Sequence, residues 1–147
     1  MEKVLNELLL YSHRQTEEEV KKFLDIVDNL EGKINLQIAK VLMKTFSEQP
    51  DWGTQESVIS TLASGDPDIV IKAILEEMPR LLKEAPRWAD TLIINEYNFN
   101  RDHLLNALQS SSQDIKDAVL TAINKPEIIN FEPSIKQLIE LLKGACQ

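Results

Sequence analysis

Few residues in this chain are of the types that perform catalysis, and they are not grouped as catalysis requires. Asp102 directly precedes His103, an order in which a carboxylate could orient an imidazole that acts as a general base. The second histidine, His13, lies far away in the sequence, and no motif for a nucleophile accompanies the pair. An Asp in the first turn of a helix more often stabilises the helix dipole. We therefore predict that the protein is not an enzyme and has no catalytic residue.

Ligands for metal ions and phosphate groups are equally sparse. The chain has one cysteine, Cys146, so no paired-cysteine metal site can form, and no His-Glu-x-x-His spacing occurs. The four glycines are scattered and do not form a loop that could surround a phosphate. Aspartates at helical spacing, such as Asp25 with Asp28, are typical of a solvated surface. The sequence predicts neither a metal site nor a cofactor.

The charge balance limits the classes of partner. The formal net charge is −8, which argues against nucleic acid and anionic membranes as ligands. It permits a basic protein partner, although the acidity could equally serve solubility alone. No apolar run approaches the roughly 20 residues of a membrane-spanning helix, and a single cysteine suits a reducing compartment. We expect a cytoplasmic protein that binds neither nucleic acid nor membranes.

The elements that must position any binding residues are predicted to be helices. Apolar residues make up 43% of the chain and recur at spacings of three and four, and no run with a period of two indicates a strand. The central stretch 51–74 is predicted to form two helices joined by a tight turn. We expect Gly65 to end the first helix in the left-handed conformation. Asp66 is expected to cap a second helix that begins at Pro67.

Other helix boundaries follow from local signals. Thr16 and Glu19 form a capping box, in which each side chain can satisfy a free backbone N–H of the first turn. A helix is expected over residues 34–47. Pro79 should kink or end the helix that contains it, because proline cannot donate the helical hydrogen bond. Pro133 is expected to open the last helix.

The asparagine-rich stretch 95–100 is predicted to be a loop, because it lacks a helical period and contains many turn-forming residues. Asn100 could then cap the following helix. Phe99 and Leu104 would pack against each other across that helix start, as a hydrophobic staple.

A weak internal repeat indicates how the helices are arranged. Shifting the chain by 46 residues superimposes the central helical pair on a later one, with Leu62 on Leu108 and Asp68 on Asp114. This period falls within the roughly 40–47 residues of HEAT-type helical pairs, whose stacking forms a continuous core. We predict an all-α fold of about eight helices in a single domain over residues 1–147. Its architecture would be a HEAT-like α-solenoid of stacked antiparallel hairpins, and a compact helical bundle is the alternative.

Aromatic and acidic residues mark the candidate partner-binding surface. Interfaces gain most of their affinity from a few aromatic anchors, and an acidic protein is expected to place carboxylates beside them. Two places qualify: the approach to the central helical pair, and the region from the second tryptophan through the asparagine-rich stretch. The predicted partner-binding residues are Asp51, Trp52, Glu56, Trp88, Glu96, Tyr97 and Asp102. Either tryptophan could instead belong to the core.

The central stretch also resembles a known family. The residues that carry the resemblance are Trp52, Gln55, Glu56, Val58, Ile59, Leu62, Asp66 and Pro67. They are similar to a pattern in small HEAT-like, all-helical immunity proteins encoded beside bacterial polymorphic toxins, including those of contact-dependent growth inhibition. In that pattern a Trp precedes a His-Glu pair, an apolar helix and an Asp-Pro that opens the partner helix. This chain has Gln55 where His is common, and the detailed resemblance covers about 20 residues.

The resemblance implies a function. A member of this family would bind and neutralise a cognate toxin domain, often a nuclease, by stoichiometric inhibition. The acidic composition is compatible with that role, because nuclease domains tend to be basic and would be attracted to an acidic binder. The alternative is a helical-repeat scaffold or adaptor that mediates protein–protein interaction and inhibits nothing.

Overall fold

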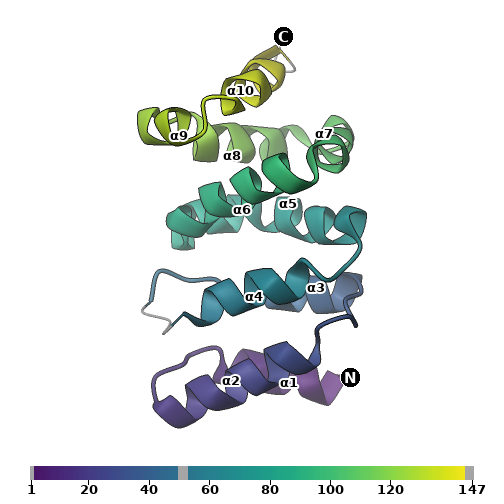
Figure 1. Cartoon of the computed structure of the whole chain (residues 1–147), viewed down its shortest axis with the longest axis vertical. Helices are drawn as coiled ribbons and strands as arrows, with labels where there is room; N and C mark the ends of the chain where they lie inside the picture. The colour runs from purple at the N-terminus through teal and green to yellow at the C-terminus, as the bar shows by residue number, and fades with distance from the viewer. Residues whose placement is uncertain (1, 50–52, 145–147) are drawn as a thin grey trace. The chain divides into compact units, whose positions relative to one another are not determined.

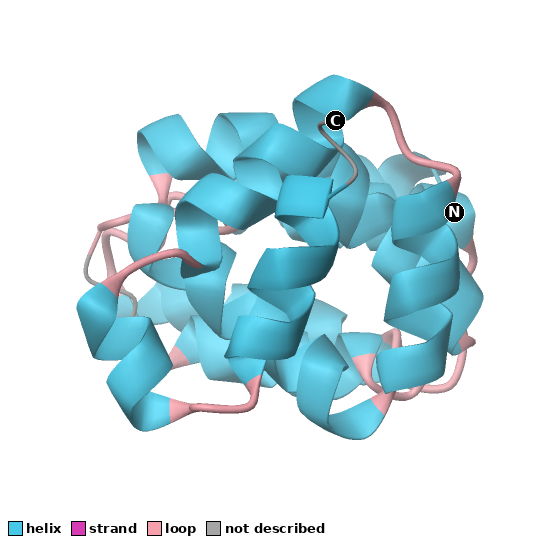
Figure 2. Cartoon of the chain, turned by 90° about the horizontal axis from the view of Figure 1, so that it is seen from above, coloured by secondary structure: helices cyan, strands magenta, loops and turns pink. Residues whose placement is uncertain are grey.

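The computed structural model describes residues 2–49 and 53–144, and all regular structure in these residues is helical (Figures 1 and 2). The described residues form ten helices and no strand, so the predicted all-α class is confirmed and the predicted number of helices was too low. The helices are α1 (Glu2–Tyr11), α2 (Glu17–Asn29), α3 (Leu36–Met43), α4 (Thr54–Leu62), α5 (Pro67–Glu84), α6 (Pro86–Phe99), α7 (Arg101–Gln109), α8 (Gln113–Ile123), α9 (Pro126–Phe131) and α10 (Ile135–Gly144).

The chain divides into two compact units, unit 1 (Met1–Ala73) and unit 2 (Ile74–Gln147), and the division falls inside α5. Each unit has its own set of buried apolar side chains. The expectations of a single domain and of a solenoid both stay predictions.

Unit 1 contains two pairs of helices packed on each other. α1 packs against α2, and α3 packs against α4. Across the pairs, α1 contacts α3 and α2 contacts α4 (Figure 1). Fully burying one large apolar side chain stabilises a fold by about 1.5–3 kcal/mol, so this core contributes substantially to the stability of unit 1. Among its most buried members are Leu8, Phe23, Val27, Ile38, Leu42, Met43 and Val58.

Two hydroxyl groups connect α4 to α2 and to the turn that follows α2. The Thr61 hydroxyl donates to the backbone carbonyl oxygen of Val27 over 3.2 Å. The Ser64 hydroxyl accepts from the backbone N–H of Gly32 at 2.8 Å and donates to the carbonyl oxygen of Thr61 at 2.6 Å. These bonds fix the end of α4 against the α2–α3 turn.

Gly65 has a different role from the one that the sequence predicts. The glycines with positive φ among the described residues are Gly32 and Gly53, at 78° and 80°, so the left-handed conformation expected at Gly65 is wrong. A Cβ atom on Gly65 would instead lie 2.8 Å from the Cβ and Cγ2 atoms of Ile34. Gly65 is therefore needed for a close approach of two segments of unit 1.

Local capping signals explain where several helices of unit 1 begin. The Thr16 hydroxyl accepts from the Glu19 N–H at 3.1 Å, which is one of the two hydrogen bonds of the predicted capping box. The helix predicted over 34–47 is shorter, Leu36–Met43, because the Asn35 side chain caps it by accepting from the Ile38 N–H at 2.9 Å. At the start of α5, an Asp66 carboxylate oxygen accepts from the N–H of Asp68 at 2.8 Å.

Unit 2 is built around a row formed by α6, α8 and α10. α8 packs against both α6 and α10, while α7 packs against α6 and α9 packs against α10 (Figure 1). α5 runs through Pro79 to Glu84, so this proline does not end the helix. The short helix α9 begins at Pro126 and ends before Pro133, and the sequence pattern did not predict it.

The stretch 95–100 is the clearest disagreement with the sequence-based expectations. It is not a loop, because α6 continues to Phe99. Phe99 is 81% exposed, so it forms no hydrophobic staple with the buried Leu104. Asn100 occupies the position before α7, but its side chain makes no capping bond.

The 46-residue shift brings helix starts into correspondence. It places α4 on α7 and the start of α5 on the start of α8. The residues before α5 and α8, Asp66 and Ser112, are also brought together, and both accept a hydrogen bond from a backbone N–H of the first turn. The shift therefore records a repeat of the local signals that begin these helices.

Candidate protein-binding surfaces

Three predicted binding residues lie at the central helical pair, and Glu56 is the one that is both described and exposed. Asp51 and Trp52 lie outside the described residues. Glu56 is exposed in the first turn of α4, whereas its neighbour Gln55 is buried. The Gln55 side-chain oxygen accepts from the backbone N–H of Ser47 at 2.7 Å, so Gln55 holds the segment before α4 in place. Of Gln55 and Glu56, only the exposed Glu56 can contact a partner protein.

Trp88 belongs to the core of unit 2. Its side chain is only 7% exposed on α6, and the guanidinium carbon of Arg87 lies 5.5 Å from the centre of its ring. A residue buried to this extent offers a partner little surface. The observed burial matches the alternative assignment of this tryptophan to the core.

Tyr97 is more deeply buried still, with an exposed fraction of 1%. Its hydroxyl donates to the backbone carbonyl oxygen of Ser134 at 3.0 Å, which links α6 to the segment just before α10. The Ser134 hydroxyl in turn donates to a carboxylate oxygen of Glu132 at 2.6 Å. Tyr97 therefore holds two segments of unit 2 together, and it cannot present the exposed aromatic surface that the loop prediction implied.

The junction of α6 and α7 gathers polar side chains around Tyr97. The Arg101 guanidinium carbon lies 3.9 Å from the centre of the Tyr97 ring, and its Nε donates to the Tyr97 carbonyl oxygen at 3.1 Å. The half-buried Glu96 accepts from the Asn100 side-chain amide at 2.9 Å. Burial raises the pKa of Glu96, while the bond from Asn100 and the nearby His103 act in the opposite direction.

Asp102 is exposed in the first turn of α7, beside this junction. The structure thus brings Glu96, Tyr97 and Asp102 to one end of α6 and α7, and only Asp102 is fully exposed there. A carboxylate in the first turn stabilises the helix dipole, so the position of Asp102 has a structural explanation that needs no partner.

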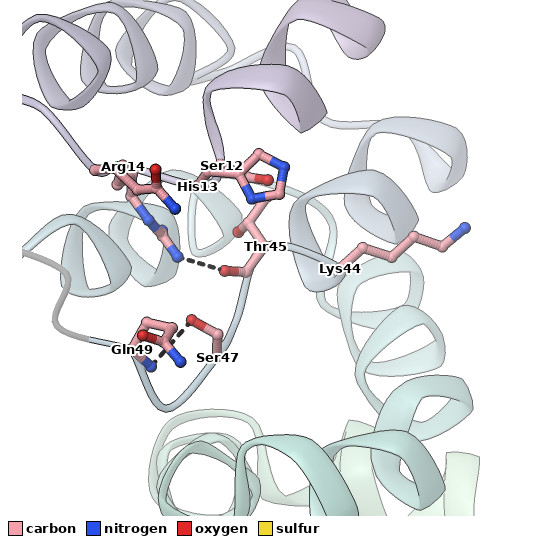
Figure 3. A pocket seen from close by; sticks show the side chains of 8 residues that line it. Ser12, His13, Arg14, Lys44, Thr45, Ser47 and Gln49 are labelled. Atoms are coloured by element: carbon pink, nitrogen blue, oxygen red, sulfur yellow. Dashed lines mark hydrogen bonds between the residues drawn. The ribbon is translucent and has the colours of Figure 1, made fainter.

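A cavity in unit 1 was not foreseen. It has a volume of about 650 Å³ (Figure 3). The residues that line it are Ser12, His13, Arg14, Gln15, Lys44, Thr45, Ser47 and Gln49. No periodicity could have revealed it, because most of these residues lie in the segments between helices.

Arg14 is the unusual residue of this cavity. Its side chain is only 3% exposed, and its backbone has φ of 50°, which non-glycine residues rarely adopt. The guanidinium donates to the Thr54 hydroxyl at 3.1 Å and to the Thr45 carbonyl oxygen at 2.8 Å, and it lies 4.7 Å from the centre of the Phe23 ring. Arg14 thereby joins the α1–α2 segment to the end of α3 and the start of α4.

The other basic side chains of the cavity do not converge with Arg14. Lys44 extends away from the group, and the imidazole of His13 lies on the side opposite Gln49 (Figure 3). A site for an anion requires several donors that point at one place. The arrangement instead supports a structural role for Arg14, in which its hydrogen bonds hold three segments together.

A second surface runs along α2. The helical spacing of its apolar residues predicts one buried face made of Val20, Phe23, Leu24, Val27 and Leu30. Phe23, Val27 and Leu30 are buried as expected, but Val20 and Leu24 are only half-buried. These two residues lie in a shallow groove of about 360 Å³ with acidic residues on its edge. We call this surface the α2 stripe, and its residues are Glu17, Val20, Lys21, Leu24, Asp25 and Asp28.

Unit 2 has an apolar groove of its own between α7, α8 and α10. Its volume is about 240 Å³, and Leu141 on its rim is 56% exposed. We call it the α7–α10 groove, and its residues are Leu105, Leu108, Gln109, Lys116, Leu138, Leu141 and Leu142. One cation and no carboxylate line it, so its character differs from that of the α2 stripe.

Residues 2–49 and 53–144 offer few other kinds of site. No cluster of three or more His, Cys, Asp or Glu residues in these ranges is placed to hold a metal ion. None of the described helices combines the length and the apolar composition that crossing a membrane requires. No protein-family model matches the chain, and neither a curated protein nor a solved structure shows significant similarity to it.

Proposed function

We propose that the protein acts by binding another protein, as an immunity protein that neutralises a cognate toxin domain by stoichiometric inhibition. The observation that carries the proposal is the α2 stripe, where half-buried apolar side chains lie beside exposed carboxylates in a chain of net charge −8. Apolar area supplies affinity at an interface, and charge supplies specificity and speed of encounter.

The charge favours a basic target. A toxin that cleaves nucleic acid must hold phosphate groups, and it therefore presents Lys and Arg around its active site. An acidic binder is steered to such a surface by long-range attraction, and it competes with the nucleic acid for the same basic groups. A nuclease domain is accordingly the target that we propose.

The resemblance to HEAT-like immunity proteins adds support where its residues are described. Asp66 caps α5 and Pro67 opens it, as the Asp-Pro pair of that pattern would do. Gln55 is buried and holds the segment before α4, and Glu56 is exposed beside it. A polar residue at position 55 thus has a structural use. The side chain at position 56 is exposed and can contact a partner protein.

Co-expression with a basic toxin domain, sought among the genes that flank this one, tests the proposal. The protein should restore growth of cells that produce the toxin domain, and purified proteins should form a complex of equal stoichiometry. The association rate should fall as salt rises from about 0.05 to 0.5 M, because screening shortens the reach of charges from about 14 Å to about 4 Å. Failure to protect cells, together with the absence of a complex, would show that the function is wrong.

The second candidate function is that of a helical scaffold or adaptor. It is favoured by the presence of two open surfaces of different character, the α2 stripe in unit 1 and the α7–α10 groove in unit 2. A protein that joins two partners needs two such surfaces, whereas an inhibitor needs one. Formation of a ternary complex in which each partner depends on a different surface would support the scaffold and count against the inhibitor.

A further inference from the structure

We infer that the α2 stripe is the surface that receives the partner, and that the partner contributes a basic amphipathic helix to it. The inference rests on the proposed function for the identity of the partner, and on the structure for the surface. It was not among the predicted sites, because the sequence pattern assigned Val20 and Leu24 to the core.

The spacing of the stripe makes it one continuous strip of helix surface. Its residues follow one another at intervals of three and one, so they lie on the same side of α2 over about three turns. The strip is roughly 16 Å long at 1.5 Å per residue. Phe23 and Val27, on the adjoining inward side of α2, are fully buried, whereas the residues of the strip keep exposed surface. A straight groove of this kind suits a partner helix lying along it.

The apolar part of the stripe gives the partner a place for an anchoring side chain. Val20 and Leu24 lie one helical turn apart, and each keeps part of its surface in contact with solvent. Covering them with an apolar side chain removes this surface from water, and such central contacts dominate the energy of most interfaces. The partner helix should therefore carry one or two large apolar residues on the face that meets α2.

The charged part of the stripe sets the sign of the partner. Glu17, Asp25 and Asp28 are exposed, and within the described residues none of them forms an ion pair. The ion pair present on α2 joins Glu18 to Lys22 at 3.1 Å, outside the stripe. Lys21 is the one cation among the described residues of the stripe, so three carboxylates face one amine. Lysines or arginines beside the apolar anchor of the partner would complement these carboxylates.

A peptide-binding experiment on the full chain tests the surface directly. The probe is a fluorescein-labelled helical peptide of about 18 residues with a leucine face flanked by lysines, followed by fluorescence anisotropy at low salt. The wild-type protein should bind it. The double variant Glu17→Lys/Asp28→Lys should bind about tenfold more weakly, because two attractions become repulsions. Leu24→Ser should weaken binding to a similar degree by removing the anchor contact.

Matched controls separate the stripe from general acidity and from other apolar surface. Asp114→Lys/Glu140→Lys changes the net charge by the same amount on exposed positions of unit 2 and should keep the affinity within about twofold. Leu141→Ser removes an exposed leucine from the α7–α10 groove and should do the same. The near-isosteric variant Glu17→Gln/Asp28→Asn removes the two charges with little change of shape. It should keep the unfolding midpoint of the wild type, so that weaker binding by this variant cannot be attributed to loss of the fold. Equal weakening by the controls, or no binding by the wild type, would overturn the inference.

The toxin domain provides the second arm and distinguishes the two proposals. If cells are protected by Glu17→Lys/Asp28→Lys as well as by the wild type, the inferred surface is wrong and the proposed function holds. If the stripe variants lose the peptide while the wild type protects no cells from the toxin, the surface holds and the function is wrong. Loss of both protection and peptide binding in the stripe variants alone supports both.

Discussion

The hydroxyl group of Tyr97 donates a hydrogen bond to the backbone carbonyl oxygen of Ser134, 3.0 Å away, and joins residues 37 apart in the sequence. The ring of the same tyrosine lies under the Arg101 guanidinium. One side chain thus connects α6, the start of α7 and the segment before α10. α6 continues through the asparagine-rich stretch to Phe99, and these contacts hold its last turn.

Replacement of Tyr97 by Phe should lower the free energy of unfolding by about 1 kcal/mol, the usual net value of one intramolecular hydrogen bond. The ring and its contacts would remain, so the change isolates the bond to Ser134. Urea denaturation followed by circular dichroism measures this loss of stability. The urea concentration at the unfolding midpoint should fall, while the dependence of the free energy of unfolding on urea should stay unchanged.

The control for this substitution is Phe99→Ala, two residues along the same helix. Phe99 is 81% exposed, so its removal should change the free energy of unfolding by less than about 0.5 kcal/mol. If Phe99→Ala proved more destabilising than Tyr97→Phe, the side of α6 that faces the core would be misassigned.

Arg14→Lys should destabilise the protein by about 2 kcal/mol, because a single ammonium group cannot reach both the Thr54 hydroxyl and the Thr45 carbonyl oxygen in the geometry of the guanidinium fork. Lys44→Met is the matched change at an exposed cation that lines the same cavity. It should leave the unfolding midpoint nearly unchanged. Equal midpoints for the two variants would contradict the structural role given to Arg14.

Gly65→Ala should cost about 1–3 kcal/mol, because the added methyl group would overlap the Ile34 side chain. Gly144→Ala adds the same group at the end of α10, where no atom lies within 4 Å, and should change stability by less than about 0.5 kcal/mol. Thermal unfolding of both variants measures the difference. A neutral Gly65→Ala would mean that the Ile34 segment moves aside at no cost.

Stability should depend on pH through Glu96, whose pKa burial raises above its ordinary value. Because the folded-state pKa exceeds the unfolded-state pKa, Glu96 contributes stability that is fully present below the unfolded-state pKa. That stability is lost as the pH rises through the folded-state pKa. Glu96→Gln removes the loss and still lets the side-chain oxygen accept from Asn100. The variant should therefore gain stability relative to the wild type as the pH rises above about 4, the ordinary range of a glutamate carboxyl group.

Urea denaturation at several pH values checks this prediction. Glu140→Gln removes one negative charge from an exposed position of α10, and its difference from the wild type should vary less with pH. A Glu96→Gln variant that lost stability relative to the wild type as the pH rose would reverse the assigned direction of the pKa.

Some helix starts of this chain were predictable because their causes are local. A hydroxyl at Thr16 meets an N–H three residues later whatever the rest of the chain does, and Ser112 does the same at the start of α8. The Asp66-Pro67 start of α5 is local in the same way. The all-α class followed from these signals together with the apolar spacing.

Features that depend on distant residues were not predictable. Nothing near Tyr97 in the sequence indicates that its hydroxyl finds the carbonyl group of Ser134, so the stretch 95–100 was assigned by its turn-forming composition alone. The need for glycine at position 65 likewise arises from Ile34, across unit 1. Single-sequence patterns record the preference of each segment, and tertiary packing can override it.

The candidate surface shows the same limit. Aromatic residues were chosen as anchors by type, yet Trp88 and Tyr97 are buried. Val20 and Leu24 were assigned to the core by their spacing, yet both keep exposed surface. Periodicity identifies the side of a helix that turns inward, but the edge of that side is set by the neighbouring helices, which the sequence does not specify residue by residue.

The bond between the backbone N–H of Gly32 and the Ser64 hydroxyl has a consequence for hydrogen exchange. Gly32 lies in an exposed turn, where amide hydrogens ordinarily exchange rapidly with deuterium from the solvent. Its acceptor comes from the residues after α4, so exchange at this single amide requires the end of α4 to separate from the turn after α2. The protection of Gly32 therefore reports how often unit 1 opens between its two pairs of helices.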